Sequence, residues 1–345
     1  MGELLFYFGH FILICYLCSK ISKQNKHMTP FYKQTWFIGG VAALAIFALC
    51  FIGINYVGQP DEEKGPDVED MVIATTQTNE PLISIARQQG WIDAEATEMS
   101  SVDASKVKDL GTAFQNSSLT SFNEFQYFVG LEEIHAGAFA HSDQLKAITI
   151  PAYVITIDEG ALAYCPALQE IKVDTANTHF DSRDNCNGII CTWKGDLKVV
   201  AGCANTVIPE KVRYIAPQAF AGCTNLKKIS FPERMDEIGE EAFKDCQALE
   251  SVEIPQGVRF VKPGTFQGCS ALKEVTLSKS VERLQKDAFA GCSSLTTINC
   301  AKKYPPIIEN AFDEFKATVY VPNGMTNTYY RDKSWKAFPT VKELP

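Results

Sequence analysis

The chain has 345 residues, a formal net charge of -9 at pH 7 and 46% hydrophobic residues. Length alone would allow about two domains of ordinary size. The acidic balance, without a cluster of lysine and arginine, argues against a nucleic-acid partner, because a phosphate backbone requires concentrated positive charge.

The first 33 residues carry an apolar stretch, 4–18, followed by several lysines. That stretch is either a second membrane span or the product of a start placed too early. Met28 is a natural alternative to Met1, because starting there leaves a short basic lead into the next apolar run. We interpret 1–33 as a cytoplasmic N-terminal segment.

Residues 34–57 form an uncharged, predominantly apolar run. A helix crossing a bilayer needs about 20 such residues, and Trp36 and Tyr56 stand where interfacial aromatics are favoured. Lysines precede the run and acidic residues follow it, so the rest of the chain is expected outside the cytoplasmic membrane. A cleaved signal peptide is the competing interpretation. We favour an uncleaved signal-anchor, because no suitable small-residue cleavage site ends the run.

Two segments separate this run from the main part of the chain. Residues 58–79 begin with a Pro-, Gly- and acid-rich stretch and are expected to form a flexible tether. Residues 80–130 combine helical periodicity with an aromatic lead-in, and we predict a cap of two short helices, the second starting near Ser100. Three phenylalanines in the lead-in are assigned to the core: Phe122, Phe125 and Phe128.

A phrase of 23 residues then repeats. Five phenylalanines mark the step: Phe220, Phe243, Phe266, Phe289 and Phe312. A leucine six residues after each of the first four, with β-branched and apolar residues beyond it, has the L-x-x-I-x-I spacing of a short strand. One unit is too small to enclose a core, so equivalent side chains of successive coils must stack. We place the repeats at 131–316 with a β insertion at about 174–207, and a C-terminal cap at 317–345.

The phrase A-F-x-G-C-x-x-L-x-x-I-x-I-P resembles the BspA-type leucine-rich repeat (LRR_5-like) of bacterial cell-surface proteins, over about 110–341. The resemblance implies a leucine-rich-repeat solenoid, β-rich within the α/β class, whose coils combine short strands with turns and 3-10 segments. Here it would be capped at both ends and preceded by the transmembrane helix. It also implies an extracytoplasmic, non-enzymatic binding module, often associated with adhesion.

The cysteines of the repeats recur at one coil position and are predicted to form an inward column of free thiols. Cys186, Cys191 and Cys203 lie outside this column, in the insertion, where a disulfide is an open alternative. Histidines are scattered, and no metal-binding or catalytic motif is present. We therefore expect no enzyme activity, no catalytic residues, no cofactor and no metal.

Function is then expected on surface that the repeat displays. Outward side chains of the predicted strands should line a long concave wall, suited to a protein or glycan ligand outside the cytoplasm, beneath or at the outer cell surface. The alternatives are a structural envelope protein without a discrete ligand and the ectodomain of a sensory or transport-associated membrane protein. The candidate binding residues are Glu170, Lys172, Lys228, Ser230, Ser251, Glu253, Glu274, Thr276, Thr297 and Asn299.

Overall fold

The computed structural model describes residues 69–345. The expected cytoplasmic segment, the signal-anchor at 34–57 and most of the tether lie outside the described residues. Within 69–345, no helix is both long and apolar enough to cross a membrane.

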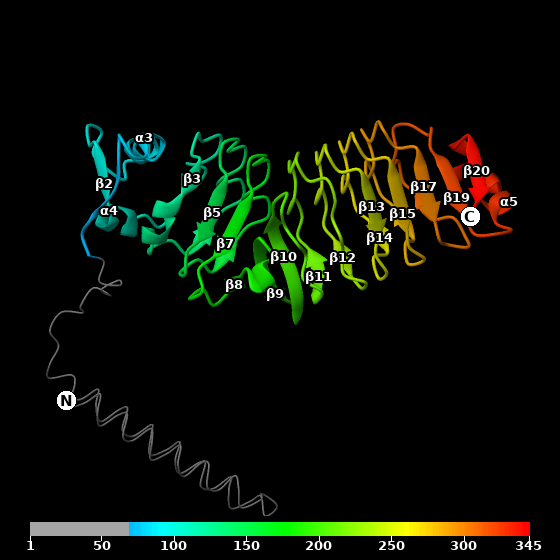
Figure 1. Cartoon of the computed structure of the whole chain (residues 1–345), viewed down its shortest axis with the longest axis horizontal. Helices are drawn as coiled ribbons and strands as arrows, with labels where there is room; N and C mark the ends of the chain where they lie inside the picture. The colour runs from blue at the N-terminus through cyan, green and yellow to red at the C-terminus, as the bar shows by residue number, and fades with distance from the viewer. Residues whose placement is uncertain (1–68) are drawn as a thin grey trace, which may run out of the picture. The chain divides into compact units, whose positions relative to one another are not determined.

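The described chain winds through successive coils that follow one another along a single axis (Figure 1). One face carries the longer strand of each coil, and we call it the long-strand face. All strand pairs on this face are parallel. One sheet contains β3 (Ser121–Phe122), β5 (Ala147–Ile150) and β7 (Glu170–Val173). The other contains β13 (Ser251–Ile254), β15 (Glu274–Leu277), β17 (Thr297–Cys300), β19 (Thr318–Val321) and β20 (Thr340–Glu343).

A second face, the short-strand face, carries the other strand of each coil. Its strands are also parallel, and they come from the apolar pairs that follow each L-x-x-I-x-I segment. They are β4 (Glu133–Ile134) with β6 (Thr156–Ile157), β11 (Val212–Ile215) with β12 (Glu237–Ile238), and β14 (Phe260–Val261) with β16 (Arg283–Leu284) and β18 (Ile307–Ile308).

The repeated phenylalanines form the predicted column between the two faces. Adjacent rings from Phe220 to Phe312 are nearly parallel, with centroids 4.9 to 5.5 Å apart. Such separations lie within the range of favourable aromatic contacts. The three phenylalanines of the lead-in are buried as well, which confirms their assignment to the core.

The cysteine column is also present, and it adds contacts that periodicity alone did not predict. The Cys246 thiol donates to the carbonyl oxygen of Phe220, one coil earlier, at 3.2 Å, and the Cys269 thiol donates to that of Phe243 at the same distance. The Phe243 carbonyl also accepts the backbone N–H of Cys246. Each such thiol therefore bonds its coil to the preceding one. The carbonyl oxygen that it uses would otherwise accept only one hydrogen bond.

The N-terminal cap contains more than the two predicted helices. Helices α3 (Glu80–Gln88) and α4 (Ser101–Ser105) form, and α4 begins with a capping box between Ser100 and Asp103. A 3-10 helix, η2 (Asn123–Tyr127), follows β3. In addition, β1 (Val72–Thr75) pairs antiparallel with β2 (Glu98–Ser100), which places a strand inside the range 58–79 expected to be a tether.

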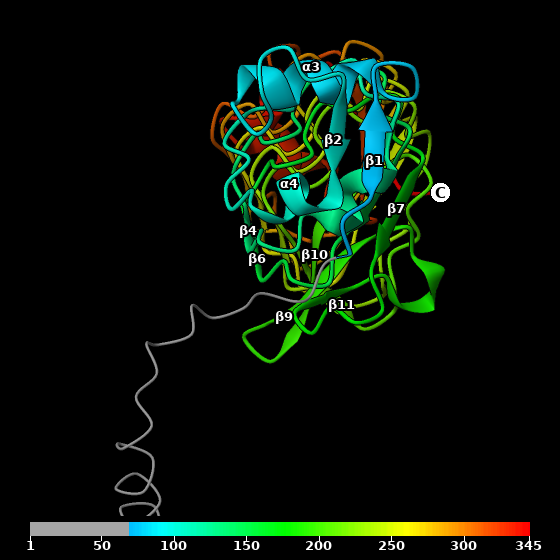
Figure 2. The ribbon, with the colours of Figure 1, turned by 90° about the vertical axis from the view of Figure 1, so that its left-hand side faces the viewer.

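The predicted β insertion forms and projects from the stack of coils (Figure 2). It contains β8 (Phe180–Asp181), η3 (Arg183–Asn185), β9 (Gly188–Trp193) and β10 (Asp196–Gly202). β8, β9 and β10 are antiparallel neighbours, whereas β10 joins β11 in parallel. The insertion thereby enters the short-strand face, and the core divides there into two clusters, one on each side.

One predicted strand is absent. Residues 226–232, which include the candidate site residues Lys228 and Ser230, form no strand. The neighbouring edge of β7 is occupied instead by the side chain of Asn187, which accepts from Ile171 N at 2.7 Å and donates to Gln169 O at 2.6 Å. Within the described residues, the segment therefore has no strand neighbour on that side, and it bonds instead to the following coil, where Glu250 N donates to Lys227 O at 3.2 Å.

The C-terminal cap consists of α5 (Thr326–Arg331), η4 (Trp335–Ala337) and β20. Tyr329, Trp335 and Phe338 are fully buried and close the core, as predicted for a terminal cap. The hydroxyl of Tyr330 lies 3.0 Å from Val341 N and 3.5 Å from Val341 O. It thereby occupies hydrogen-bonding groups of the last strand.

Candidate functional site

The predicted binding residues on the C-terminal sheet form two rows across the long-strand face. Strand register places Ser251 beside Glu274 and Glu274 beside Thr297, and it extends this row to Thr318 and Thr340. The second row runs in the same register through Glu253, Thr276, Asn299, Tyr320 and Lys342. Because successive side chains on a strand alternate between faces, both rows point away from the buried column.

Side chains in these rows bond to one another. The Asn299 amide donates to the Glu274 carboxylate at 2.6 Å and to the Thr276 hydroxyl at 3.3 Å. Thr276, Thr297 and Asn299 are half-buried, whereas Ser251, Glu253 and Glu274 are exposed. This part of the face is therefore a fixed, polar surface of small side chains.

The remaining predicted residues do not join the same surface. Glu170 and Lys172 lie on β7, in the N-terminal sheet, and pair with each other through an ion pair. Lys228 and Ser230 are exposed, but no strand places them in either row. The expected continuous wall is thus two separate sheets with a segment between them that forms no strand.

The described residues offer no built site for a metal or a reactive thiol. Among residues 69–345, no group of three or more His, Cys, Asp and Glu side chains is placed to hold a metal ion. Every cysteine in this range is a free thiol, including the three of the insertion. Burial raises the pKa of Cys165 to about 11 and that of Cys292 to about 12. Such thiols stay protonated near neutral pH and are poor nucleophiles.

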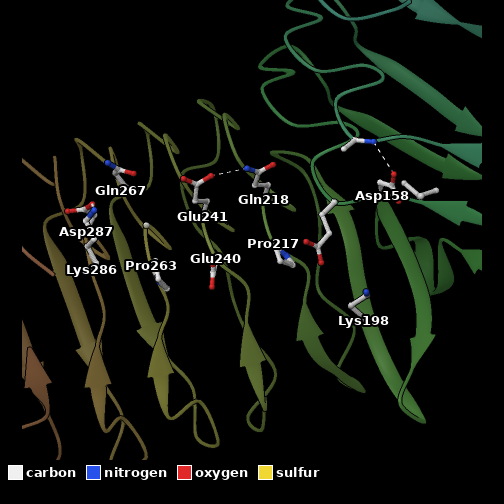
Figure 3. Close-up of a pocket in the computed structure, with 14 residues that line it drawn as sticks. Asp158, Lys198, Pro217, Gln218, Glu240, Glu241, Pro263, Gln267, Lys286 and Asp287 are labelled. Atoms are coloured by element: carbon white, nitrogen blue, oxygen red, sulfur yellow. Dashed lines mark hydrogen bonds and ion pairs between the residues drawn. The ribbon is translucent and has the colours of Figure 1, made fainter. Parts of the chain in front are cut away.

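A groove of about 860 Å³ lies across several coils, at positions that the sequence analysis did not single out (Figure 3). Most of its lining comes from the residues two and three positions before each phenylalanine, where the chain leaves the short strand. Five carboxylates, two ammonium groups and two amides line it: Asp158, Glu159, Glu240, Glu241, Asp287, Lys198, Lys286, Gln218 and Gln267.

Lys198 connects this groove with an aromatic pair formed by Trp193 of the insertion and Tyr214 of β11. The rings of Trp193 and Tyr214 meet edge to face with centroids 4.7 Å apart, and the Lys198 ammonium lies 5.1 Å from the Trp193 ring. Lys194 lies over the same ring at 3.9 Å. Trp193 precedes the two-residue turn Lys194-Gly195, whose residues both have positive φ, so the ring is carried by a tight hairpin.

The sequence contained part of the signal for this region. Trp193 and the Lys194-Gly195 turn stand out in the insertion, but their proximity to Tyr214 depends on the parallel pairing of β10 with β11. The groove residues share a coil position, yet they vary in type from coil to coil. A search for repeated residue types therefore passes over them.

Among the solved structures, a leucine-rich cell surface protein from Faecalibacterium prausnitzii shares 21% identity, with a TM-score of 0.44. The match covers 63% of this chain and 58% of that protein, so the chain spans less than two thirds of its length. The T. pallidum leucine-rich repeat protein shares 22% identity over 60% of this chain and 74% of its own, with a TM-score of 0.31. Pneumococcal vaccine antigen PcpA shares 16% identity over 63% and 66%, with a TM-score of 0.38. No curated protein matches.

The family comparison agrees with the repeat that the sequence and the coils display. Six copies of the BspA type leucine-rich repeat region match residues 105–187 and 201–318, which together make up more than half of the chain. The break between the two matched ranges falls within the insertion. The chain belongs to the BspA-type leucine-rich repeat family.

Proposed function

We propose that this chain is a membrane-anchored, extracytoplasmic binding module whose long-strand face contacts a protein on a cell surface. The observation that carries the proposal is the pair of register-matched rows on β13, β15, β17, β19 and β20. Ten outward positions lie there on a rigid parallel sheet, and a repeat array typically uses such an extended surface to bind. The uncharged run at 34–57 supports anchoring in the cytoplasmic membrane.

The character of the face favours a protein over a small ligand. The bonded set of Asn299, Glu274 and Thr276 is fixed before any partner arrives, which lowers the entropic cost of binding. Tyr320, half-buried in the second row, supplies an aromatic side chain of the type enriched at interaction hot spots.

A photo-crosslinking experiment in intact cells tests the proposal. A photoreactive amino acid at Thr276 should yield a discrete adduct with a second protein, whereas the same group at Gln247, on an exposed turn, should not. Glu274→Lys should abolish the Thr276 adduct without changing the melting temperature. If Thr276 gives no adduct, or gives the same adducts as Gln247, the long-strand face is not the binding surface.

A structural role in the envelope, without a discrete ligand, is the second candidate. It is favoured by the bonds that Glu274, Thr276 and Asn299 make with one another and by the ion pair of Glu170 with Lys172, because these groups are already satisfied without a partner. Under this role, crosslinks from Thr276 would reach only abundant neighbours and would persist in Glu274→Lys. Protease treatment of intact cells distinguishes a module on the outer surface from one beneath an outer layer, because only the buried module would resist cleavage.

A further inference from the structure

The groove and the aromatic pair of Trp193 and Tyr214 both adjoin Lys198, which lines the groove and lies 5.1 Å from the Trp193 ring. From their chemistry we propose a second binding site here, for a neutral, hydroxyl-rich polysaccharide. This site is separate from the long-strand face, and its existence does not depend on the function proposed for that face.

The first argument is the charge of the groove, which carries both signs and is partly paired. The Glu241 carboxylate pairs with Lys244 at 2.7 Å, and Asp287 lies 3.8 Å from Lys286. Asp158 lies 3.5 Å from an imidazole nitrogen of His135 and also accepts the backbone N–H of Ala136.

Within the described part of the chain, Glu159, Glu240 and Lys198 remain without an ion pair. In the same part of the chain, the carboxylates of Asp158, Glu159 and Glu240 have no lysine or arginine partner, and the Lys198 ammonium stands among them. This mixture of signs does not create the single-signed field that a charged polymer requires. A polyanion would meet these carboxylates, and a polycation would meet Lys198. A ligand without formal charge meets neither obstacle.

The second argument is the set of hydrogen-bonding groups. The free carboxylates of Glu159 and Glu240 accept hydrogen bonds from hydroxyl groups, and the Gln267 amide can both donate and accept. Sugar hydroxyls offer both roles at closely spaced positions. In addition, Pro217 and Pro263 line the groove and provide flat apolar surface between these groups.

The third argument is the aromatic pair at one end. Trp193 is only partly buried, and its contact with Tyr214 fixes its orientation. The C–H face of a sugar ring is apolar and packs against such a ring while its hydroxyl groups remain free to bond elsewhere. Lys194, on the exposed turn, covers this ring and would move aside, since it forms no ion pair within residues 69–345.

Calorimetric titration of the full chain tests this site with four probes: maltohexaose, cellohexaose, mannohexaose and hexagalacturonic acid. At least one neutral hexasaccharide should bind, and the anionic hexamer should bind at least tenfold more weakly. Trp193→Ala should weaken neutral binding at least tenfold. Glu240→Gln and Glu159→Gln, at exposed positions where folding is least affected, should each weaken it about fivefold, because a charged acceptor is replaced by a neutral one.

Three matched controls make the outcome decisive. Tyr304→Ala removes an exposed aromatic and Glu253→Gln an exposed carboxylate, both outside the groove, and neither should alter binding. Lys194→Ala should leave the affinity unchanged or increase it. The proposal is overturned if no neutral hexasaccharide binds, if Trp193→Ala and Glu240→Gln bind as the unaltered chain does, or if the controls weaken binding equally. None of these results bears on the long-strand face, which the Thr276 crosslink tests.

Discussion

Removing one ring from the phenylalanine column should destabilise one half of the solenoid and not the other. Phe266 is fully buried and stacks on Phe243 at 5.4 Å and on Phe289 at 5.5 Å. Deleting a buried phenylalanine side chain typically costs about 3–5 kcal/mol, and this ring loses two stacked partners. We take about 4 kcal/mol for Phe266→Ala, which corresponds to a roughly thousandfold increase in the opening equilibrium, since about 1.4 kcal/mol is tenfold.

The division of the core determines where this loss is felt. Phe266 belongs to the C-terminal cluster, whereas Phe122 belongs to the N-terminal one. In a repeat array each coil contacts only its neighbours, so destabilisation should stop at the insertion. Native-state hydrogen exchange should show a loss of protection for amides of β13, β15 and β17, with little change in β5 and β7.

A reciprocal variant and a milder one complete the experiment. Phe122→Ala should give the opposite pattern, with loss of protection in β5 and β7 only. Phe266→Leu keeps much of the apolar volume and should cost about 1–1.5 kcal/mol, which keeps the test interpretable if the alanine variant unfolds. Equal loss of protection on both sides of the insertion in either variant would refute the argument, because the two clusters would then open as one unit.

Three further predictions concern single contacts. Tyr330→Phe removes the hydroxyl group that bonds to Val341 N and leaves the edge of β20 free to pair with another chain. The fraction of self-associated protein in analytical ultracentrifugation should increase, and an unchanged distribution would contradict this. Tyr164→Phe removes a 3.2 Å bond to Asp245 and should lower the free energy of unfolding by about 1 kcal/mol, with no additional loss in the double variant with Asp245→Asn. Burial raises the pKa of Cys165 to about 11 and of Cys292 to about 12. The unfolded chain therefore loses these protons first, so stability to urea should fall as the pH rises from about 9 toward 12, and less steeply in Cys292→Ala. Stability that rises over this range would contradict the prediction.

The sequence predicted the columns of the core well because each column has one physical requirement. Phe243, Cys246 and Leu249 are fully buried, and each occupies a space bounded by the same residue types one coil before and one coil after. Burial in such a space demands a particular size and polarity, and that demand returns every 23 residues. The capping role of Trp335 and Phe338 followed from the same logic, because the last coil exposes apolar surface that needs cover.

The predictions were weaker wherever the structure depends on how two coils meet. The strand expected at 226–232 has the right spacing but has no strand neighbour on one side, where Asn187 occupies the edge of β7. Strand β20 has no repeat phrase of its own and forms because the edge of β19 is available to it. Spacing reports which side chains face inward, but it does not report which backbone groups are already bonded.

The candidate site shows the same limit on a larger scale. The outward positions on the long-strand face could be predicted because side chains alternate between the two sides of a strand. The register of β13, β15 and β17 agrees with this prediction. The groove could not be predicted from the sequence, because its lining combines six coils with a strand of the insertion. No property of Glu240 or Gln267 in the sequence indicates that Lys198 lies in the same groove.

Gly202 links the division of the core with the position of the groove. Its N–H donates to Ala219 O at 2.9 Å, the carbonyl that would otherwise accept the N–H of an aligned coil residue such as Leu162. A Cβ atom at Gly202 would lie 2.2 Å from the ring of Phe220, so the ring packs directly against glycine backbone. Because glycine has no ring to continue the column, stacking ends at Phe220 and a second core begins on the other side of the insertion. The same strand that brings Gly202 into the core also carries Lys198 to the surface between the two sets of coils. The insertion therefore interrupts the repeat in its interior and shapes a surface that no regular coil could form.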